Sequence, residues 1–128
     1  MHKIVLLFIV LFGFAQAGSS LPTADAVVSG FQKAKLEIIV DVRRDHKPQA
    51  NVTQYHTWVV FSAKVNGKIQ SIGEIYEFFT LQDLADSQRL YGSDAMRIST
   101  SHKNIVLLVN RSVPAALAAK YQASLKEL

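Results

Sequence analysis

The sequence predicts an α+β fold: a mostly antiparallel sheet of about five strands with helices packed on one side, in the order α-β-β-β-α-β-β-α after a signal peptide. Residues 54–79 read as two strands that reverse at Asn66-Gly67, a pair that supplies the positive φ angles of a type I′ turn. Strand-like runs follow one another through tight turns, and helical stretches interrupt these runs. At 128 residues, the chain is also long enough to bury one core without disulfides or metals.

The N-terminal segment has the pattern of a signal peptide. A short basic start precedes an apolar run, residues 4–14, and the run leads into Ala15-Gln16-Ala17, a small-x-small sequence of the kind that signal peptidase accepts. The run is about half of the ~20 residues that span a bilayer, and it is apolar on all sides, unlike an amphipathic anchor. We therefore expect an exported protein, periplasmic or secreted, that is cleaved after Ala17 and keeps a single α+β domain over residues 18–128.

The composition indicates the cellular compartment of the protein and argues against some classes of partner. The chain has no cysteine, and because small secreted proteins of eukaryotes usually depend on disulfides, this favours a bacterial periplasm. Two glycosylation sequons, at Asn51 and Asn110, point weakly to the eukaryotic secretory route instead. The formal net charge is +4, but the basic residues are scattered and form no stripe with interleaved aromatic residues. We expect no nucleic-acid partner and no membrane span in the mature chain.

The first half of the domain is predicted to be a helix and three strands. The helix lies in TADAVVSGFQKAKLE, with Thr23 as N-cap. Its apolar stripe is formed by Val27, Val28, Phe31 and Ala34. A strand over residues 36–43 follows, and its apolar side chains share one face: Leu36, Ile38, Val40 and Val42. A polar connection containing Pro48 leads to the two strands of the ribbon, residues 54–65 and 68–79.

The second half is predicted to be a helix, two strands and a final helix. Thr80 caps the helix in TLQDLADSQRLYG, and Gly92 ends it. Strands are expected over residues 95–100 and 104–109, the second of them apolar without a break, as in a strand covered on both faces. Ser112 is the expected N-cap of the last helix, which has Pro114 in its first turn.

A two-residue turn without bulges would set the faces of the ribbon. His56 would then be opposite Glu77, Trp58 opposite Ile75 and Phe61 opposite Ile72. One face would carry His56, Trp58, Val60, Ser62, Gly73, Ile75 and Glu77. The bulkier face, which is the expected core side, would carry Tyr55, Val59, Phe61, Ile72, Tyr76 and Phe78.

His56, Trp58 and Glu77 are the candidate binding residues. A carboxylate holds an imidazole in one tautomer and raises its basicity, and an indole beside the pair can stack on a ligand. The same His–Glu pair also contributes ~0.2–1 kcal/mol to a sheet without any ligand. The cluster from Asp41 to His46 is expected to be a solvated strand end with mutual ion pairs.

Motifs for catalysis, metal binding and cofactor binding were not found. The sequence has no Gly-x-Ser-x-Gly elbow, cysteine nucleophile, glycine-rich phosphate loop or paired-carboxylate motif. His46, His56 and His102 lack the spacing of zinc ligands. We therefore predict no catalytic residue, no metal ligand and no cofactor, and the sequence does not identify a small-molecule ligand.

Two functions of different classes remain. The first is a non-enzymatic exported domain that binds a protein partner or self-associates, because the ribbon carries more large apolar side chains than one sheet face hides. The alternative is a small hydrolase or ligand-modifying enzyme that uses His56 and Glu77. The first hypothesis predicts that Trp58→Ala weakens association, and the second predicts that His56→Gln abolishes enzymatic activity.

A helix followed by a long antiparallel ribbon, over roughly residues 23–79, resembles the cystatin-like fold. In cystatins the protease-binding loop carries Gln-x-Val-x-Gly, and the resemblance implies a cystatin-like protease inhibitor as a further alternative. The corresponding connection here is Gln49-Ala50-Asn51-Val52-Thr53, which keeps the Gln but lacks Val at the third place and Gly at the fifth. A likeness at the level of the fold does not transfer function.

Overall fold

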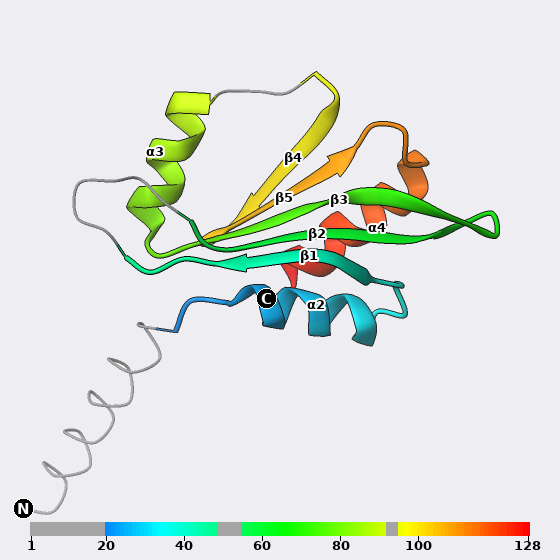
Figure 1. Cartoon of the computed structure of the whole chain (residues 1–128), viewed down its shortest axis with the longest axis horizontal. Helices are drawn as coiled ribbons and strands as arrows, with labels where there is room; N and C mark the ends of the chain where they lie inside the picture. Colours follow the sequence, from blue (N-terminus) through cyan, green and yellow to red (C-terminus); the bar gives the residue numbers. More distant parts are fainter. Residues whose placement is uncertain (1–19, 49–54, 92–94) are drawn as a thin grey trace, which may run out of the picture.

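The computed structural model describes residues 20–48, 55–91 and 95–128, and within them it shows an open, five-stranded antiparallel sheet with three helices (Figure 1). The elements are α2 (Ala24–Lys33), β1 (Ile39–Asp45), β2 (Tyr55–Val65), β3 (Lys68–Phe78), α3 (Leu81–Tyr91), β4 (Arg97–His102), β5 (Ile105–Asn110) and α4 (Ala115–Lys126). The strands lie side by side in the order β1-β2-β3-β5-β4. This confirms the predicted α+β fold and the predicted order of elements.

Some expectations fall outside the described residues. They are the signal peptide with its cleavage after Ala17, the sequon at Asn51 and the helix stop at Gly92. In the ranges that are described, no helix has both the length and the apolar character needed to cross a membrane.

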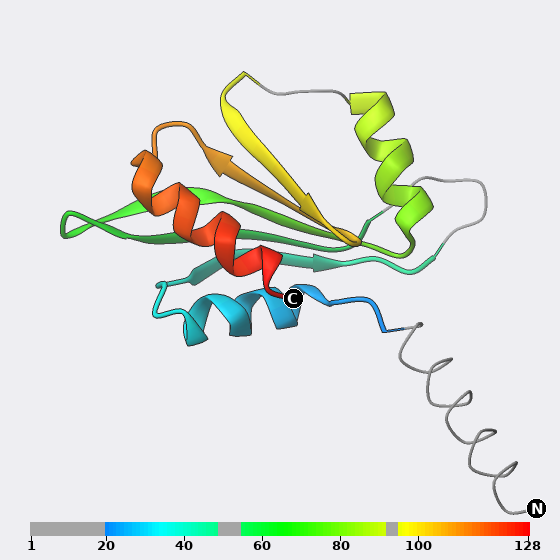
Figure 2. The same cartoon turned by 180° about the vertical axis from the view of Figure 1, so that it is seen from behind.

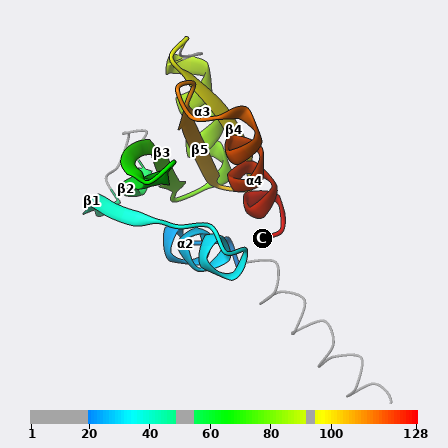
Figure 3. The ribbon, with the colours of Figure 1, turned by 90° about the vertical axis from the view of Figure 1, so that its right-hand side faces the viewer.

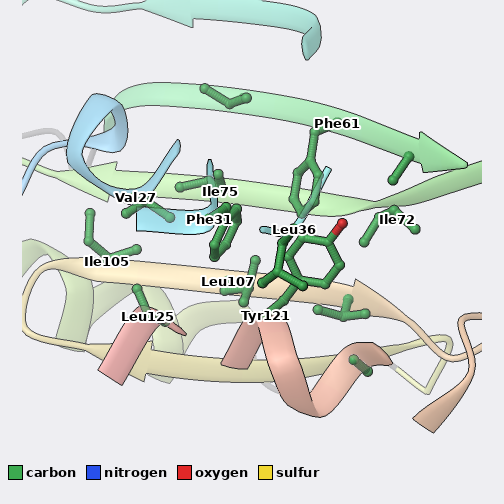
Figure 4. Packing of buried hydrophobic residues seen from close by; sticks show 14 of the residues in the cluster. Val27, Phe31, Leu36, Phe61, Ile72, Ile75, Ile105, Leu107, Tyr121 and Leu125 are labelled. Carbon is green, nitrogen blue, oxygen red and sulfur yellow. The ribbon is translucent and has the colours of Figure 1, made fainter. Parts of the chain in front are cut away.

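Helices α2 and α4 lie next to each other on one side of the sheet (Figure 2 and Figure 3). Their apolar side chains form one core with the strands, as Figure 4 shows. Phe31 of α2 is at its centre, because its ring lies 4.9 Å from that of Tyr121 in α4 and 5.8 Å from that of Phe61 in β2. We call this side of the sheet the helix face.

Helix α3 packs against the opposite side, which we call the open face. Leu84 of α3 is buried together with Phe78 of β3 and Val106 of β5. The predicted covering of one side of the sheet therefore holds for α2 and α4, whereas α3 covers one end of the other side. Strand β5 contributes alternate side chains to both clusters, as expected from its unbroken apolar sequence.

The turn of the ribbon is as predicted. Asn66 and Gly67 have φ angles of 52° and 81°, which fit a type I′ turn, and Val65 pairs with Lys68. The ribbon is thus a tight hairpin of two 11-residue strands.

Bulges change the faces of the strands. The β1–β2 pairing shifts between Val40 and Val42, and the β2–β3 pairing skips His56 on one strand and Ile72 on the other. At a β-bulge two residues oppose one, so the alternation of side chains restarts beyond it. Val40 and Val42, predicted on one face, lie on opposite faces of the edge strand and are 47% and 38% exposed.

The register predicted without bulges therefore holds from the turn to Ser62 and is wrong from Phe61 to Thr57. Glu77 is opposite Thr57 instead of His56, and Trp58 is opposite Tyr76 instead of Ile75. The same shift places Gly73, and not Ile72, opposite Phe61.

The membership of the two ribbon faces changes accordingly. Val59, Phe61 and Ile72 are in the core as predicted, and Ile75, predicted on the other face, joins them. The side chains predicted on the core side that pack instead in the open-face cluster are Tyr55, Tyr76 and Phe78.

Two of the three predicted helix caps are present. The Thr23 hydroxyl accepts a hydrogen bond from the Ala26 amide, and the Thr80 hydroxyl accepts one from the Asp83 amide. The cap predicted at Ser112 is wrong: Pro114 is the N-cap of α4, and no side chain caps it. Pro114 thus lies just outside the first turn in which it was predicted, and because its side chain has no hydrogen-bond acceptor, α4 starts without a side-chain cap.

Candidate functional site

The three predicted site residues divide between the two faces. His56 and Glu77 lie together, with 3.5 Å between His56 Nδ1 and Glu77 Oε2. Trp58 points to the open face, where its neighbour across the strands is Tyr76. The predicted His–Glu pair is thus present, but the indole is not beside it.

The pair belongs to a polar group that we call the His56 cluster: Asp45, His56, Thr57 and Glu77. Thr57 is 1% exposed, and its hydroxyl donates to Asp45 Oδ1 at 2.8 Å. The hydroxyl hydrogen is thereby used, so Thr57 accepts from His56 Nδ1–H, 2.7 Å away. The contact favours the Nδ1–H tautomer and leaves Nε2 as an acceptor on a side chain that is 43% exposed.

Glu77 connects this cluster to the first helix. Its Oε1 accepts a hydrogen bond of 2.8 Å from the Ala24 amide, the first N–H group of α2. A carboxylate at this place satisfies an unpaired helix donor and interacts favourably with the positive helix end. Glu77 therefore has a structural role that a bound ligand is not needed to explain.

Asp45 completes the cluster on strand β1. The hydrogen bond from Thr57, and then that from Arg43, hold the pKa of the Asp45 carboxyl below its ordinary value. The Arg43–Asp45 pair is one of the mutual ion pairs predicted for this strand end, and Arg43 also pairs with Asp25 of α2.

A second group of polar and aromatic side chains lies on the open face, and we call it the Glu74 cluster: Arg44, Trp58, Glu74, Tyr76 and Arg97. Glu74 Oε1 accepts from Trp58 Nε1 at 2.7 Å and from the Tyr76 hydroxyl at 3.0 Å. Its other oxygen pairs with Arg97 of β4. Burial raises the pKa of the Tyr76 hydroxyl above its ordinary value. The Glu74 carboxylate thus has three donors, Trp58, Tyr76 and Arg97, and it fixes the orientation of the indole and the phenol.

Arg44 of β1 extends this cluster to the edge of the sheet. Its guanidinium carbon lies 5.7 Å from the centre of the Trp58 ring, which is a cation–π distance. Among the described residues Arg44 has no acidic partner, whereas Arg97 is neutralised by Glu74. The open face therefore presents an ordered indole beside a guanidinium with unused donors.

Sequence reasoning identified Trp58 but not the other members of the Glu74 cluster. Glu74 and Trp58 are neighbours only after the bulge at Ile72, and Arg97 comes from β4, which β5 separates from β3 in the sheet. The one local signal was the period of two in β3, which places Glu74 and Tyr76 on the same face.

The described ranges contain no group of three or more His, Cys, Asp or Glu side chains arranged to hold a metal ion. The connection over residues 49–53, which corresponds to the protease-binding loop of cystatins, lies outside them. Comparisons of the chain with protein-family models, with curated proteins and with solved structures found no match.

Proposed function

We propose that this protein is an exported, non-enzymatic domain that binds a protein partner through the Glu74 cluster on the open face of its sheet. The observation that carries the proposal is the arrangement of Trp58: a half-buried indole, oriented by Glu74, stacked on Tyr76 and flanked by Arg44. Tryptophan, tyrosine and arginine dominate the binding energy of protein interfaces when they are held in place before binding.

Neighbouring side chains make this part of the open face apolar. Val42 of β1 is 38% exposed, and Val60 of β2 and Leu108 of β5 are half-buried. Trp58 and Tyr76 stack with their ring planes 29° apart and 6.4 Å between centroids, which gives a continuous aromatic surface. An apolar centre with charged groups at its rim is the usual anatomy of a protein interface.

The charge of the cluster favours a partner with an acidic side chain. The charges of Glu74 and Arg97 neutralise each other, so the cluster keeps the positive charge of the Arg44 guanidinium. A guanidinium stacked on an aromatic ring keeps its N–H donors directed to one side, where they match a carboxylate. We therefore propose a partner segment that places an apolar side chain against Trp58 and an acidic side chain against Arg44.

Arg44→Ala and Trp58→Ala are expected to weaken partner binding, with Trp58→Ala lowering the affinity by at least ~10-fold, as for a hot-spot residue. Arg44 is exposed and forms no ion pair among the described residues, so its removal should change the free energy of unfolding by less than ~0.5 kcal/mol. The measurement is the affinity of a captured and purified partner for each variant, alongside a thermal melt.

Ile69→Ala is the matched control, because Ile69 is an apolar side chain, 67% exposed, next to the turn of the ribbon and away from the cluster. Binding by this variant should equal that of the unmodified chain. Equal affinity of the Trp58→Ala and Ile69→Ala variants would show that the open face is not the binding surface.

A second candidate, a small hydrolase or ligand-modifying enzyme, has one observation in its favour: Thr57 and Glu77 orient His56 with Nε2 free to accept a proton. The binding proposal expects no hydrolytic activity that depends on this histidine. Assays with ester, amide and phosphoester substrates test it, with His56→Gln as the variant. Hydrolysis by the unmodified chain that disappears in His56→Gln would favour the enzyme.

A further inference from the structure

The two edges of the sheet are built differently. Strand β1 at one edge carries Asp41, Arg43, Arg44 and Asp45 and contains a bulge. Charges and bulges are the usual means by which edge strands avoid pairing with other chains. Strand β4 at the other edge pairs with β5 in an unbroken register from Arg97 to His102, and its residues 98–101 are uncharged. Over residues 98–101 this edge has neither the charged side chains nor the bulge of the first.

The register shows which backbone groups of β4 point outward. Strands β4 and β5 close at a two-residue turn, and the Arg111 amide donates to the Met96 carbonyl, so the even-numbered residues of β4 bond to β5. The N–H and C=O groups of Ser99 and Ser101 therefore point away from the sheet. Among the described residues, the Ser101 carbonyl accepts a hydrogen bond from Lys126 Nζ at 2.8 Å.

We infer that β4 is a docking edge for a second copy of this chain, which pairs with it antiparallel about a two-fold axis at Ser99. In that arrangement Ser99 exchanges both backbone hydrogen bonds with Ser99 of the second copy, and the two sheets become continuous. The occupant is a second copy because the edge is complementary to itself: Ile98 comes opposite Thr100, and Arg97 comes opposite Ser101. No like charges meet across the axis, and Ile98 and Thr100 form a β-branched cross-strand pair.

Lys126 competes for this edge. Its ammonium group, on the exposed side chain at the end of α4, covers the Ser101 carbonyl in the single chain. A lysine at a free edge disfavours further pairing, so the dimer forms only when the second strand takes the place of Lys126 or shares the carbonyl with it.

Charge substitution at Ser99 tests the axis directly. Ser99 is exposed, and in the proposed dimer it faces its own copy, so Ser99→Lys and Ser99→Asp each place like charges opposite each other. By sedimentation across a range of protein concentrations, we expect the unmodified chain to dimerise and each variant alone to remain monomeric. An equimolar mixture of the two variants should dimerise again, because opposite charges then meet at the axis.

Backbone variants separate strand pairing from any other contact. Ser99→Pro removes the outward N–H and leaves the hydrogen bonds to β5 in place, so it should be folded and monomeric, while Ser99→Ala, which keeps the N–H, should dimerise. Ser101→Pro serves the same purpose if Ser99→Pro fails to fold. An unmodified chain that stays monomeric at the highest concentration it tolerates overturns the inference, as does a Ser99→Lys variant that still dimerises. Neither result bears on the open-face proposal, because Ser99 is not part of the Glu74 cluster.

Discussion

Gly73→Ala is expected to destroy the pairing of β3 with β5, and with it the fold. A Cβ atom at residue 73 would lie 1.8 Å from the Leu108 carbonyl oxygen and 2.9 Å from its carbon. These are backbone atoms of the neighbouring strand, so no side chain can turn aside to make room. The cost should exceed the ~1–3 kcal/mol of ordinary overpacking and take up much of the ~5–15 kcal/mol that stabilises a domain. Urea unfolding followed by circular dichroism measures it.

Gly67→Ala is the matched control for this substitution. A Cβ atom at residue 67 meets nothing within 4 Å, and the only cost is the positive φ of 81°, about 1 kcal/mol. If the Gly73→Ala variant unfolds at the same urea concentration as Gly67→Ala, the close approach of β3 and β5 is not a feature of the protein.

Phe31→Ala is expected to lower the free energy of unfolding by ~3–5 kcal/mol. The ring is completely buried and contacts Phe61 and Tyr121, so its loss leaves a cavity between a helix, the sheet and the last helix. Val28→Ala, a smaller change at a half-buried position of the same helix, should cost no more than ~1.5 kcal/mol. Equal midpoints for the two variants in chemical denaturation would contradict the central place of Phe31 in the core.

Local signals in the sequence predicted most of the fold. The Asn66-Gly67 turn and the caps at Thr23 and Thr80 depend on residues close in the chain, and the structure contains all three. The bulge at Ile72 has no such local signal, because a bulge depends on how two strands pair with each other. One extra residue there was enough to exchange Ile75 and Tyr76 between the faces.

Only the part of the candidate site that lies within one hairpin was predictable from the sequence. His56 and Glu77 were paired by counting back from the turn, and they do lie together, although the bulge at Ile72 makes Thr57 the residue opposite Glu77. The Glu74–Arg97 pair joins strands that are separated along the chain by α3. Its prediction needs the strand order, which the sequence of one chain does not specify.

The place of Tyr121 against Phe31 and Phe61 has a consequence for how the protein is made. A nascent chain that lacks α4 leaves these two rings exposed to water, and α2, with 10 residues, is too short to persist as a helix by itself. We therefore expect folding to await the synthesis of the last helix and to proceed in one late, cooperative step.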